Sequence, residues 1–240
     1  PLIPHTRPIA FNDYSALDQI DPETAAVILE TIQGGAGFIV PDPDYLKTLK
    51  SKCDAVGALL ILDEIQPGFG RTGRLFGFEH FGVVPDIVVM GKGMGGGMPI
   101  GALTASKAMM ETFATKPKLG HITTFGGHPV IAAAALATLK IISGDGFFSA
   151  VLEKEQLLRR ELQHPKIKEV RGKGLMLAII LENPNQANEL VLRSAKRGLI
   201  LFWLLYEDKA VRITPPLTIS NQEIGQGCQI IREVLDSLDA

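Results

Sequence analysis

The sequence predicts an α/β fold with a mostly parallel sheet, and three short apolar runs carry that prediction. The runs cover residues 27–30, 59–63 and 87–90. Continuous branched-aliphatic runs of this length are typical of strands that are buried on both faces of a parallel sheet. The first run ends at Glu30, the second ends at Asp63, and the third leads to Lys92. Because ligands of open α/β sheets bind beyond the carboxyl ends of the strands, we expect these three side chains to converge on one crevice.

A helix is predicted between the first two strands. Asp42 can cap it, Pro43 fits its first turn, and Gly57 ends it. Its apolar residues share one face and are Tyr45, Leu46, Leu49, Cys53 and Val56. This β-α-β unit predicts parallel strands with a right-handed crossover. Residues 62–85, which are rich in glycine and phenylalanine, are predicted to form a loop with short helical turns.

A fourth strand is predicted at residues 102–105, antiparallel to the third. Only about ten residues separate it from Lys92, whereas a helical crossover takes a dozen or more. The apolar periodicity then predicts three helices, at residues 106–114, 129–142 and 147–162.

The C-terminal part is predicted to be a smaller α+β domain. Strands are expected at residues 174–181, 199–204 and 210–213, with helices at residues 186–197 and from Asn221 onward. We place the boundary near Gly144, so residues 1–143 form part of a larger domain and residues 144–240 form the smaller one. Since the chain begins with Pro1 and not with methionine, we expect it to be a fragment that lacks the N-terminal portion of the larger domain.

The composition restricts the class of protein and of partner. A hydrophobic fraction of 46% with 21% charged residues is ordinary for a soluble globular protein. The net charge of −2 gives no electrostatic reason to expect nucleic acid or a membrane surface as a partner. The longest apolar stretch, residues 130–142, is shorter than the roughly 20 residues that span a bilayer. The two cysteines, Cys53 and Cys228, predict neither a disulfide framework nor a metal site, and a cytoplasmic location is the simplest inference.

Lys92 and Asp63 are the residues for which the sequence indicates a catalytic or coenzyme-binding role most strongly. A lysine in a loop is usually a solvated charge, but Gly91 and Gly93 leave room for a planar ring to approach the backbone. The flexible stem and the amine of lysine suit it to Schiff-base chemistry. A strand-end aspartate commonly caps a turn, yet a carboxylate against a pyridine nitrogen favours the protonated ring. A lysine with an aspartate partner is the known arrangement for binding pyridoxal phosphate.

Two nucleotide-binding patterns compete with that interpretation. The aliphatic run before Asp63 and Glu64 also matches the magnesium-holding strand of a nucleotide-hydrolysing enzyme, but no Gly-x-x-x-x-Gly-Lys-Ser/Thr loop is present. Residues 91–96 fit Gly-x-Gly-x-x-Gly, and Glu111 follows about 20 residues later. A dinucleotide fingerprint opens directly into a helix, which Pro99 argues against. A nucleotide-hydrolysing or noncatalytic α/β protein is the alternative from another class.

Several longer motifs occur in order along the chain. They are Asp63-Glu64-Ile65-Gln66, Gly68-Phe69-Gly70-Arg71-Thr72-Gly73, Pro85-Asp86-Ile87, Gly91-Lys92, His121-Ile122-Thr123-Thr124-Phe125-Gly126-Gly127-His128-Pro129 and Arg212-Ile213-Thr214-Pro215-Pro216. Together they resemble the signature of class III (omega-type) aminotransferases, which use pyridoxal 5′-phosphate. The resemblance covers essentially the whole chain as the C-terminal portion of such an enzyme. It implies fold type I, which is a mostly parallel sheet with one antiparallel strand and a smaller C-terminal domain, and a homodimer with shared active sites.

The resemblance implies a coenzyme role for six residues. Lys92 would be the catalytic residue and would bind the coenzyme covalently. Asp63 would pair with the ring nitrogen, Ile65 would pack on one ring face, and Gln66 would donate to the phenolate oxygen. The remaining two are neighbours in the chain, Thr123 and Thr124, and the second would bind the coenzyme phosphate of the neighbouring subunit. The alternative for Thr124 is that its hydroxyl caps the helix that follows Pro129.

Two further residues are implied to bind substrate. Arg212 would grip the α-carboxylate of glutamate or 2-oxoglutarate, a task suited to a bidentate guanidinium. Glu30 matches a family acid near the substrate. The expected reaction moves an amino group from an amino acid, with an omega-amine such as ornithine, acetylornithine or 4-aminobutyrate as donor, to 2-oxoglutarate. A same-fold aminomutase or decarboxylase is the alternative, since Asp63 and Lys92 would serve either.

The sequence departs from the family pattern at three positions. Gly35 stands where ornithine- and 4-aminobutyrate-type members often carry a glutamate that pairs with the carboxylate-binding arginine. Thr31 replaces a common proline, and His128 replaces a common asparagine. The upstream phosphate-binding loop and the aromatic residue that stacks on the other ring face are not in this sequence. The first departure leaves the identity of the amino donor open.

Overall fold

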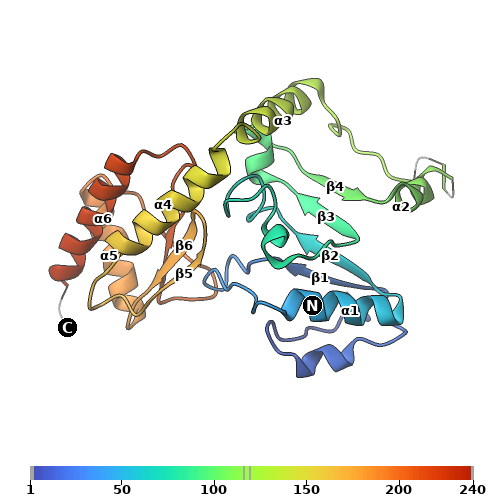
Figure 1. Cartoon of the computed structure of the whole chain (residues 1–240), viewed down its shortest axis with the longest axis horizontal. Coiled ribbons are helices and arrows are strands. Elements are labelled where there is room, and N and C mark those ends of the chain that lie inside the picture. The colour runs from blue at the N-terminus through green and yellow to red at the C-terminus, as the bar shows by residue number, and fades with distance from the viewer. Residues whose placement is uncertain (1–2, 116, 119, 239–240) are drawn as a thin grey trace.

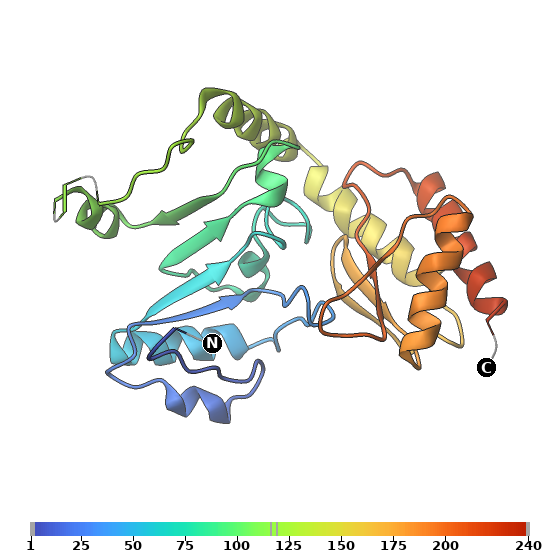
Figure 2. The same ribbon diagram turned by 180° about the vertical axis from the view of Figure 1, so that it is seen from behind.

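The computed structural model describes residues 3–115, 117–118 and 120–238, and its elements are organised around two four-stranded sheets (Figures 1 and 2). The first sheet has the order β1-β2-β3-β4. Its strands are β1 (Ala26–Glu30), β2 (Leu59–Asp63), β3 (Ile87–Met90) and β4 (Ala102–Ala105). Strands β1, β2 and β3 are parallel and β4 is antiparallel to β3, so the predicted mixed sheet is confirmed.

Helix α1 (Tyr45–Val56) packs against the first sheet through an apolar cluster. The cluster joins Leu49 and Cys53 of the helix to Leu62 of β2. The prediction that Asp42 caps this helix is wrong. The N-cap is Asp44, because the chain first makes a turn in which the amide of Tyr45 donates to the carbonyl of Asp42 at 3.0 Å.

The first part of the chain also contains several short helices and one longer helix. They are η1 (Ser15–Gln19), η2 (Gly77–Phe81), η3 (Lys92–Gly95), α2 (Lys107–Glu111), η4 (Thr112–Ala114) and α3 (Pro129–Ile142). The helix predicted at residues 106–114 is divided into α2 and η4. Neither piece contains a buried residue, so no packing favours a single regular helix there. The predicted bounds of α3 are confirmed.

The second sheet is antiparallel throughout and has the order β5-β6-β8-β7. Its strands are β5 (Glu169–Lys173), β6 (Met176–Ile180), β7 (Phe202–Trp203) and β8 (Ala210–Ile213). Three helices share its main apolar core, namely α4 (Phe147–Glu161), α5 (Pro184–Lys196) and α6 (Asn221–Asp236) (Figure 1). All elements of this sheet lie after Gly144, while the division into two domains stays a prediction.

Strand β6 connects the two halves of the molecule, which are the parts built around the first and the second sheet, because both of its faces are buried. Leu177 and Ile179 belong to the core that the three helices cover. Met176 and Ala178 belong to a second apolar cluster that includes Phe38, which lies in the loop after β1. The two sheets are therefore joined by a continuous apolar contact beside the carboxyl end of β1.

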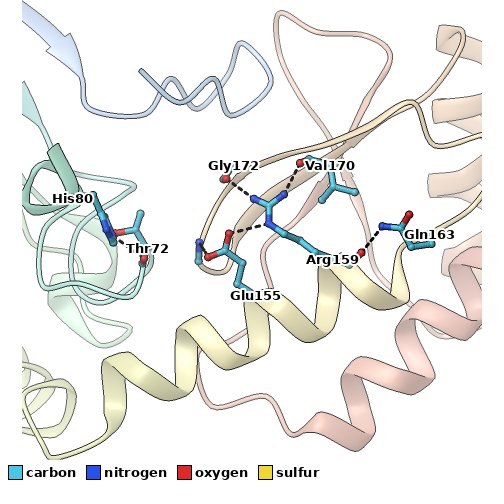
Figure 3. Close-up of polar contacts among 8 residues, drawn as sticks. Thr72, His80, Glu155, Arg159, Gln163, Val170 and Gly172 are labelled. Atoms are coloured by element: carbon cyan, nitrogen blue, oxygen red, sulfur yellow. Dashed lines mark hydrogen bonds and ion pairs between the residues drawn. The ribbon is translucent and has the colours of Figure 1, made fainter. Parts of the chain in front are cut away.

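A polar clamp on α4 holds the β5–β6 turn (Figure 3). Arg159 donates from Nη1 to the carbonyl of Val170 and from Nη2 to the carbonyl of Gly172, both at 2.6 Å, while its Nε donates to Glu155 at 2.9 Å. The other oxygen of Glu155 accepts from the amide of Gly174 at 2.7 Å. A Cβ atom at Gly174 would lie 2.5 Å from the carbonyl oxygen of Arg71, so only glycine permits this close approach between the halves.

His80 makes the fold sensitive to acid. Its Nε2 lies 3.0 Å from the carbonyl of Thr72, and burial lowers its pKa from 6.5 to about 4, with the charge of Lys173 as a lesser cause (Figure 3). The unfolded chain therefore binds a proton here between pH 6.5 and about 4 that the folded chain does not bind, so stability falls as the pH is lowered through that range. We expect His80→Gln to flatten this acid slope when urea midpoints are measured from pH 7 to 4.5. His5→Gln, at an exposed position, is the control and should leave the slope as it is.

Within the described ranges, no single helix is long and apolar enough to cross a membrane. Helices α3 and α4 pass that test only as a pair bent by 72°.

Candidate functional site

The carboxyl ends of β1, β2 and β3 lie at one edge of the first sheet and carry the three residues singled out from the sequence. Glu30 pairs in register with Asp63, and Asp63 pairs with Val89. Lys92 follows three residues after Val89 and begins η3. The strand register thus places Glu30, Asp63 and Lys92 at this edge, while their convergence on one crevice stays a prediction.

Lys92 has an unusual backbone conformation. Its φ is +42°, in the left-handed region, which costs a residue other than glycine about 1–3 kcal/mol. Ile65 lies beside the preceding residue, Gly91, since a Cβ atom at Gly91 would be 3.5 Å from the Cγ2 atom of Ile65. The side chain of Lys92 is exposed. An amine held on a strained, exposed turn next to an aliphatic side chain is well placed to react with a planar ligand.

Asp63 and the residue after it face different surroundings. The Oδ1 atom of Asp63 accepts a hydrogen bond from the amide of Ile65 at 2.8 Å, which leaves Oδ2 available. Glu64 is fully buried, and its carboxylate accepts from Thr31, Gly77 and Phe78. A buried carboxylate that is already hydrogen-bonded is a poor magnesium ligand, which weighs against the nucleotide-hydrolysing alternative.

Gln66 and Arg212 bring the two sheets together at the site. Arg212 lies on β8, and its Nη2 donates to the Oε1 atom of Gln66 at 3.3 Å. Its guanidinium carbon lies 5.8 Å from the ring centre of Phe38, and its buried Nε has no hydrogen-bond partner among the described residues. A guanidinium with an unused donor can take up a carboxylate. Phe38 was not predicted as a site residue, and no local sequence signal identifies it.

Glu30 and Gln66 are held against each other by a glycine. The amide of Gly34 donates to Glu30 Oε2 at 2.9 Å. A Cβ atom at Gly34 would lie 2.7 Å from Gln66 Nε2 and 3.0 Å from Glu30 Oε2, so this position admits no side chain without displacing them. Glu30, Gln66 and Arg212 therefore form one connected group.

Tyr206 occupies the space beside Gly35. The amide of Tyr206 donates to the carbonyl of Gly35 at 2.9 Å. A Cβ atom at Gly35 would lie 3.1 Å from the tyrosine ring. The aromatic ring of Tyr206, from the part of the molecule around the second sheet, thus covers the position where some class III aminotransferases carry a glutamate side chain. No local sequence pattern predicts this contact.

A second arginine supports Arg212. Arg71 is largely buried, and its Nη1 donates to the carbonyl oxygens of Leu175 at 3.2 Å and Pro215 at 2.6 Å. Burial lowers the pKa of Arg71 to about 10, and the charge of Arg212 contributes. Arg71 therefore stays charged at neutral pH and adds positive potential near Arg212. Its position inside a glycine-rich loop motif was the signal available in the sequence.

Thr123 and Thr124 are not brought to this group. Both lie in an exposed stretch before α3, and no hydrogen bond joins either to the residues above within the described part of the chain. The alternative that Thr124 caps α3 is wrong. The N-cap is His128, whose Nδ1 accepts from the amide of Val130 at 3.2 Å. The described ranges contain no group of three or more His, Cys, Asp or Glu residues that could hold a metal ion.

Comparison with known proteins decides the family. The sequence profile described as aminotransferase class-III matches residues 8–235. The chain belongs to this family. Among its relatives, an acetylornithine aminotransferase of Caldanaerobacter subterraneus is 39% identical over 99% of the chain and 60% of its own length. A putrescine aminotransferase of Pectobacterium atrosepticum is 40% identical over 100% of the chain and 54% of its own length.

Solved structures of class-III aminotransferases have the same fold. An ornithine aminotransferase of Toxoplasma gondii, reported with partial occupancy of PLP at its active site, matches with a TM-score of 0.89 and 33% identity over 99% of this chain and 57% of its own. An N-acetylornithine aminotransferase of Stenotrophomonas maltophilia matches with a TM-score of 0.85 and 34% identity over 96% of this chain and 62% of its own. The chain thus spans little more than half the length of these relatives. The fold is that of the pyridoxal-phosphate-dependent aminotransferases, and pyridoxal 5′-phosphate is the coenzyme of the family.

Proposed function

We propose that the protein containing this chain transfers an amino group from an omega-amine, such as ornithine, acetylornithine or 4-aminobutyrate, to 2-oxoglutarate. Its relatives include acetylornithine, ornithine and putrescine aminotransferases, and their names support the donor class. One observation carries the proposal: Asp63 and Lys92 lie at one sheet edge, and Arg212 reaches the same edge from the other half of the molecule.

The residues at this edge fit the coenzyme. Pyridoxal phosphate supplies an aldehyde that combines with amines and a ring that withdraws electrons from the reacting carbon. Lys92 would bind the aldehyde carbon, and the free oxygen of Asp63 would pair with the ring nitrogen. Because Arg212 can only donate, the Oε1 atom of Gln66 faces it and Nε2 remains to donate to the phenolate oxygen. Ile65, which lies beside Gly91, would pack on a ring face.

Lys92 would also move the proton on which amino transfer depends. Once an amino substrate takes its place, the Nζ atom of Lys92 is free to accept a proton from the substrate carbon and to return it. The exposed position of the side chain and its flexible stem permit that movement.

Arg212 and Glu30 would bind the substrate. The unpartnered Nε of Arg212 and the charge of Arg71 nearby favour a carboxylate, and 2-oxoglutarate brings two. Glu30 is held by Gly34 at one oxygen and has the other oxygen for an amine.

We also propose that two copies of the chain share their active sites, with Thr124 binding the coenzyme phosphate of the partner. Residues 121–130 are exposed throughout and include three exposed large apolar side chains, Ile122 and Phe125 at 73% and Val130 at 56%, and a group of exposed apolar side chains supports a surface that a partner covers. A cytoplasmic location is proposed as well, in keeping with two free, buried cysteines.

Mixed dimers test the shared site. In a homodimer of either variant, Lys92→Ala or Thr124→Ala, both active sites carry the substitution. A heterodimer of the two variants would have one site with both defects and one intact site. We expect co-expression of the inactive variants to recover about a quarter of the wild-type activity. Recovery of none would contradict a site built from two subunits, and mixing either variant with itself is the control.

A donor screen on the full-length holoenzyme tests the proposed reaction. Ornithine, acetylornithine, 4-aminobutyrate and putrescine are each supplied with 2-oxoglutarate, and glutamate formation is measured. At least one donor should yield glutamate in proportion to donor consumed. Release of carbon dioxide, or an isomerised donor without glutamate, would instead support the decarboxylase or aminomutase alternative.

A further inference from the structure

Glu64 lies at the meeting point of the segments that carry the site. The residue is completely buried. Its Oε1 accepts from the hydroxyl of Thr31 at 2.5 Å and from the amide of Phe78 at 3.0 Å, and its Oε2 accepts from the amide of Gly77 at 2.7 Å. No cation within the described ranges forms an ion pair with it. Neutral donors alone therefore stabilise this carboxylate.

The backbone of Glu64 is anchored as firmly as its side chain. Its amide donates to the carbonyl of Val89 in β3 at 2.8 Å, and its carbonyl accepts from the amide of Gly68 at 3.0 Å. The amide of Thr31 donates to the carbonyl of Asp63 at 3.4 Å. The ends of β1, β2 and β3 are thus tied together through one residue and its threonine partner.

The anchoring of Glu64 determines where its neighbours point. Successive side chains of an extended segment alternate between faces. With the side chain of Glu64 held inside by three donors, Asp63, the last residue of β2, is directed to the opposite face. Ile65 lies in the turn that follows, and its amide donates to the Oδ1 atom of Asp63 at 2.8 Å, so the two residues are fixed together. Burial raises the pKa of Glu64, whereas its three hydrogen bonds lower it, so the loss of a donor weakens the charged form that these donors require.

We propose that Glu64, held by the Thr31 hydroxyl, is a positioning residue that orients Asp63 and Ile65 toward the coenzyme. This inference rests on the proposed function. Glu64 touches neither the coenzyme nor the substrate in this assignment. It acts by fixing the end of β2 relative to the ends of β1 and β3, and thereby relative to Lys92.

The test compares Glu64→Gln and Thr31→Val with wild type in the full-length protein. Glutamine presents an N–H group to the amide of Gly77, and valine removes the hydroxyl while it keeps the shape of threonine. We expect the dissociation constant for pyridoxal phosphate, titrated into the apo protein, to rise about ten- to a hundredfold in Glu64→Gln, as when residues that orient ligands are replaced. Thr31→Val should show a smaller rise, and Thr31→Ser should restore the wild-type value.

Two further readouts separate positioning from general stability. The pH at which the visible band of the bound coenzyme changes should shift in Glu64→Gln, since Asp63 no longer holds the ring nitrogen as before. The kcat should fall, whereas the KM for 2-oxoglutarate should change little, because Arg212, which is assigned to bind 2-oxoglutarate, is unchanged. Glu153→Gln, at an exposed site on α4, is the matched control and should alter none of these quantities.

The outcomes are distinguishable. The positioning role would be overturned if Glu64→Gln and Thr31→Val unfold at lower urea concentrations but keep the coenzyme affinity, the visible band and the kcat of wild type. The proposed function would still stand in that case. A wild-type protein that neither binds pyridoxal phosphate nor transfers an amino group would overturn both. If Glu64→Gln does not fold, Thr31→Val decides, because its shape is conserved and an unchanged affinity in that variant contradicts the proposal.

Discussion

Lys92→Ala is expected to abolish the visible absorbance of the bound coenzyme and to lower kcat by at least about a thousandfold. The amine at this position is proposed both to hold the aldehyde carbon and to carry the proton at the substrate carbon. Loss of a positioned proton carrier alone typically costs a factor of about 10²–10⁴. The measurement is an absorbance spectrum of the purified holoenzyme together with single-turnover rates with glutamate.

Lys196→Ala is the matched control for that experiment, since Lys196 is an exposed lysine in the last turn of α5. It should leave spectrum and rate at wild-type values. A retained coenzyme band in Lys92→Ala, with the same intensity and position, would contradict the assignment of Lys92. The assignment would be supported if Lys92→Ala loses the band and an added primary amine slowly restores turnover.

Arg212→Ala is expected to raise the KM for 2-oxoglutarate by roughly 30- to 1,000-fold, which corresponds to about 2–4 kcal/mol for removal of one partner of a buried charge pair. The guanidinium has a buried Nε that finds no acceptor among the described residues, contacts Gln66 at 3.3 Å, and lies over the ring of Phe38. Arg212→Lys keeps the charge but not the two-pronged geometry, and should lie between alanine and wild type.

The control for this prediction is Arg197→Ala, which removes a surface arginine paired with Glu233. It should not change the KM. Coenzyme affinity in Arg212→Ala should stay within about twofold of wild type, since the residue is assigned to the substrate. If coenzyme binding and 2-oxoglutarate use decline together by the same factor, Arg212 serves the structure of the site and not the substrate.

The first sheet was predictable from sequence because its strands are short apolar runs and a short glycine-rich link limits the connection between β3 and β4. The predicted burial of its strands on both faces is wrong for β1, where Ile28 is 67% exposed. Residues 87–90 and 102–105 match β3 and β4, including the antiparallel direction of the latter. Strand β5 was missed, since Glu169, Arg171 and Lys173 alternate with Val170 and Gly172 on a partly exposed edge. An edge strand of that composition forms because β6 offers a complete set of partners, and a local pattern does not contain this information.

The chemical core of the site was predictable for a related reason. Parallel strands end at one edge of a sheet, so the sequence alone assigns Glu30, Asp63 and the loop residue Lys92 to that edge. Contacts between the two halves could not be predicted from local sequence. Tyr206 covers Gly35 and Phe38 lies under Arg212 only because the second sheet packs on the loop after β1.

Backbone strain was also invisible in the sequence. Phe38, Phe69 and Lys92 all have a positive φ, between 42° and 55°, although none is a glycine. Phenylalanine and lysine rarely adopt a positive φ, so the contacts made by the surrounding structure must hold the backbone in this conformation. His5 and Asn12 also have a positive φ, so two of the five such residues among those described, Phe38 and Lys92, belong to the candidate site.

The contacts of Arg71 restrict how the molecule can change shape during a reaction. Its guanidinium donates hydrogen bonds to the carbonyls of Leu175 and Pro215, and Gly174 lies against its backbone. Any rotation of one sheet against the other would have to break these contacts. Residues 143–146, between α3 and α4, are exposed and free of that constraint. Domain closure in this protein is therefore expected to be small, and the flexibility that substrate entry needs must come from loops at the rim.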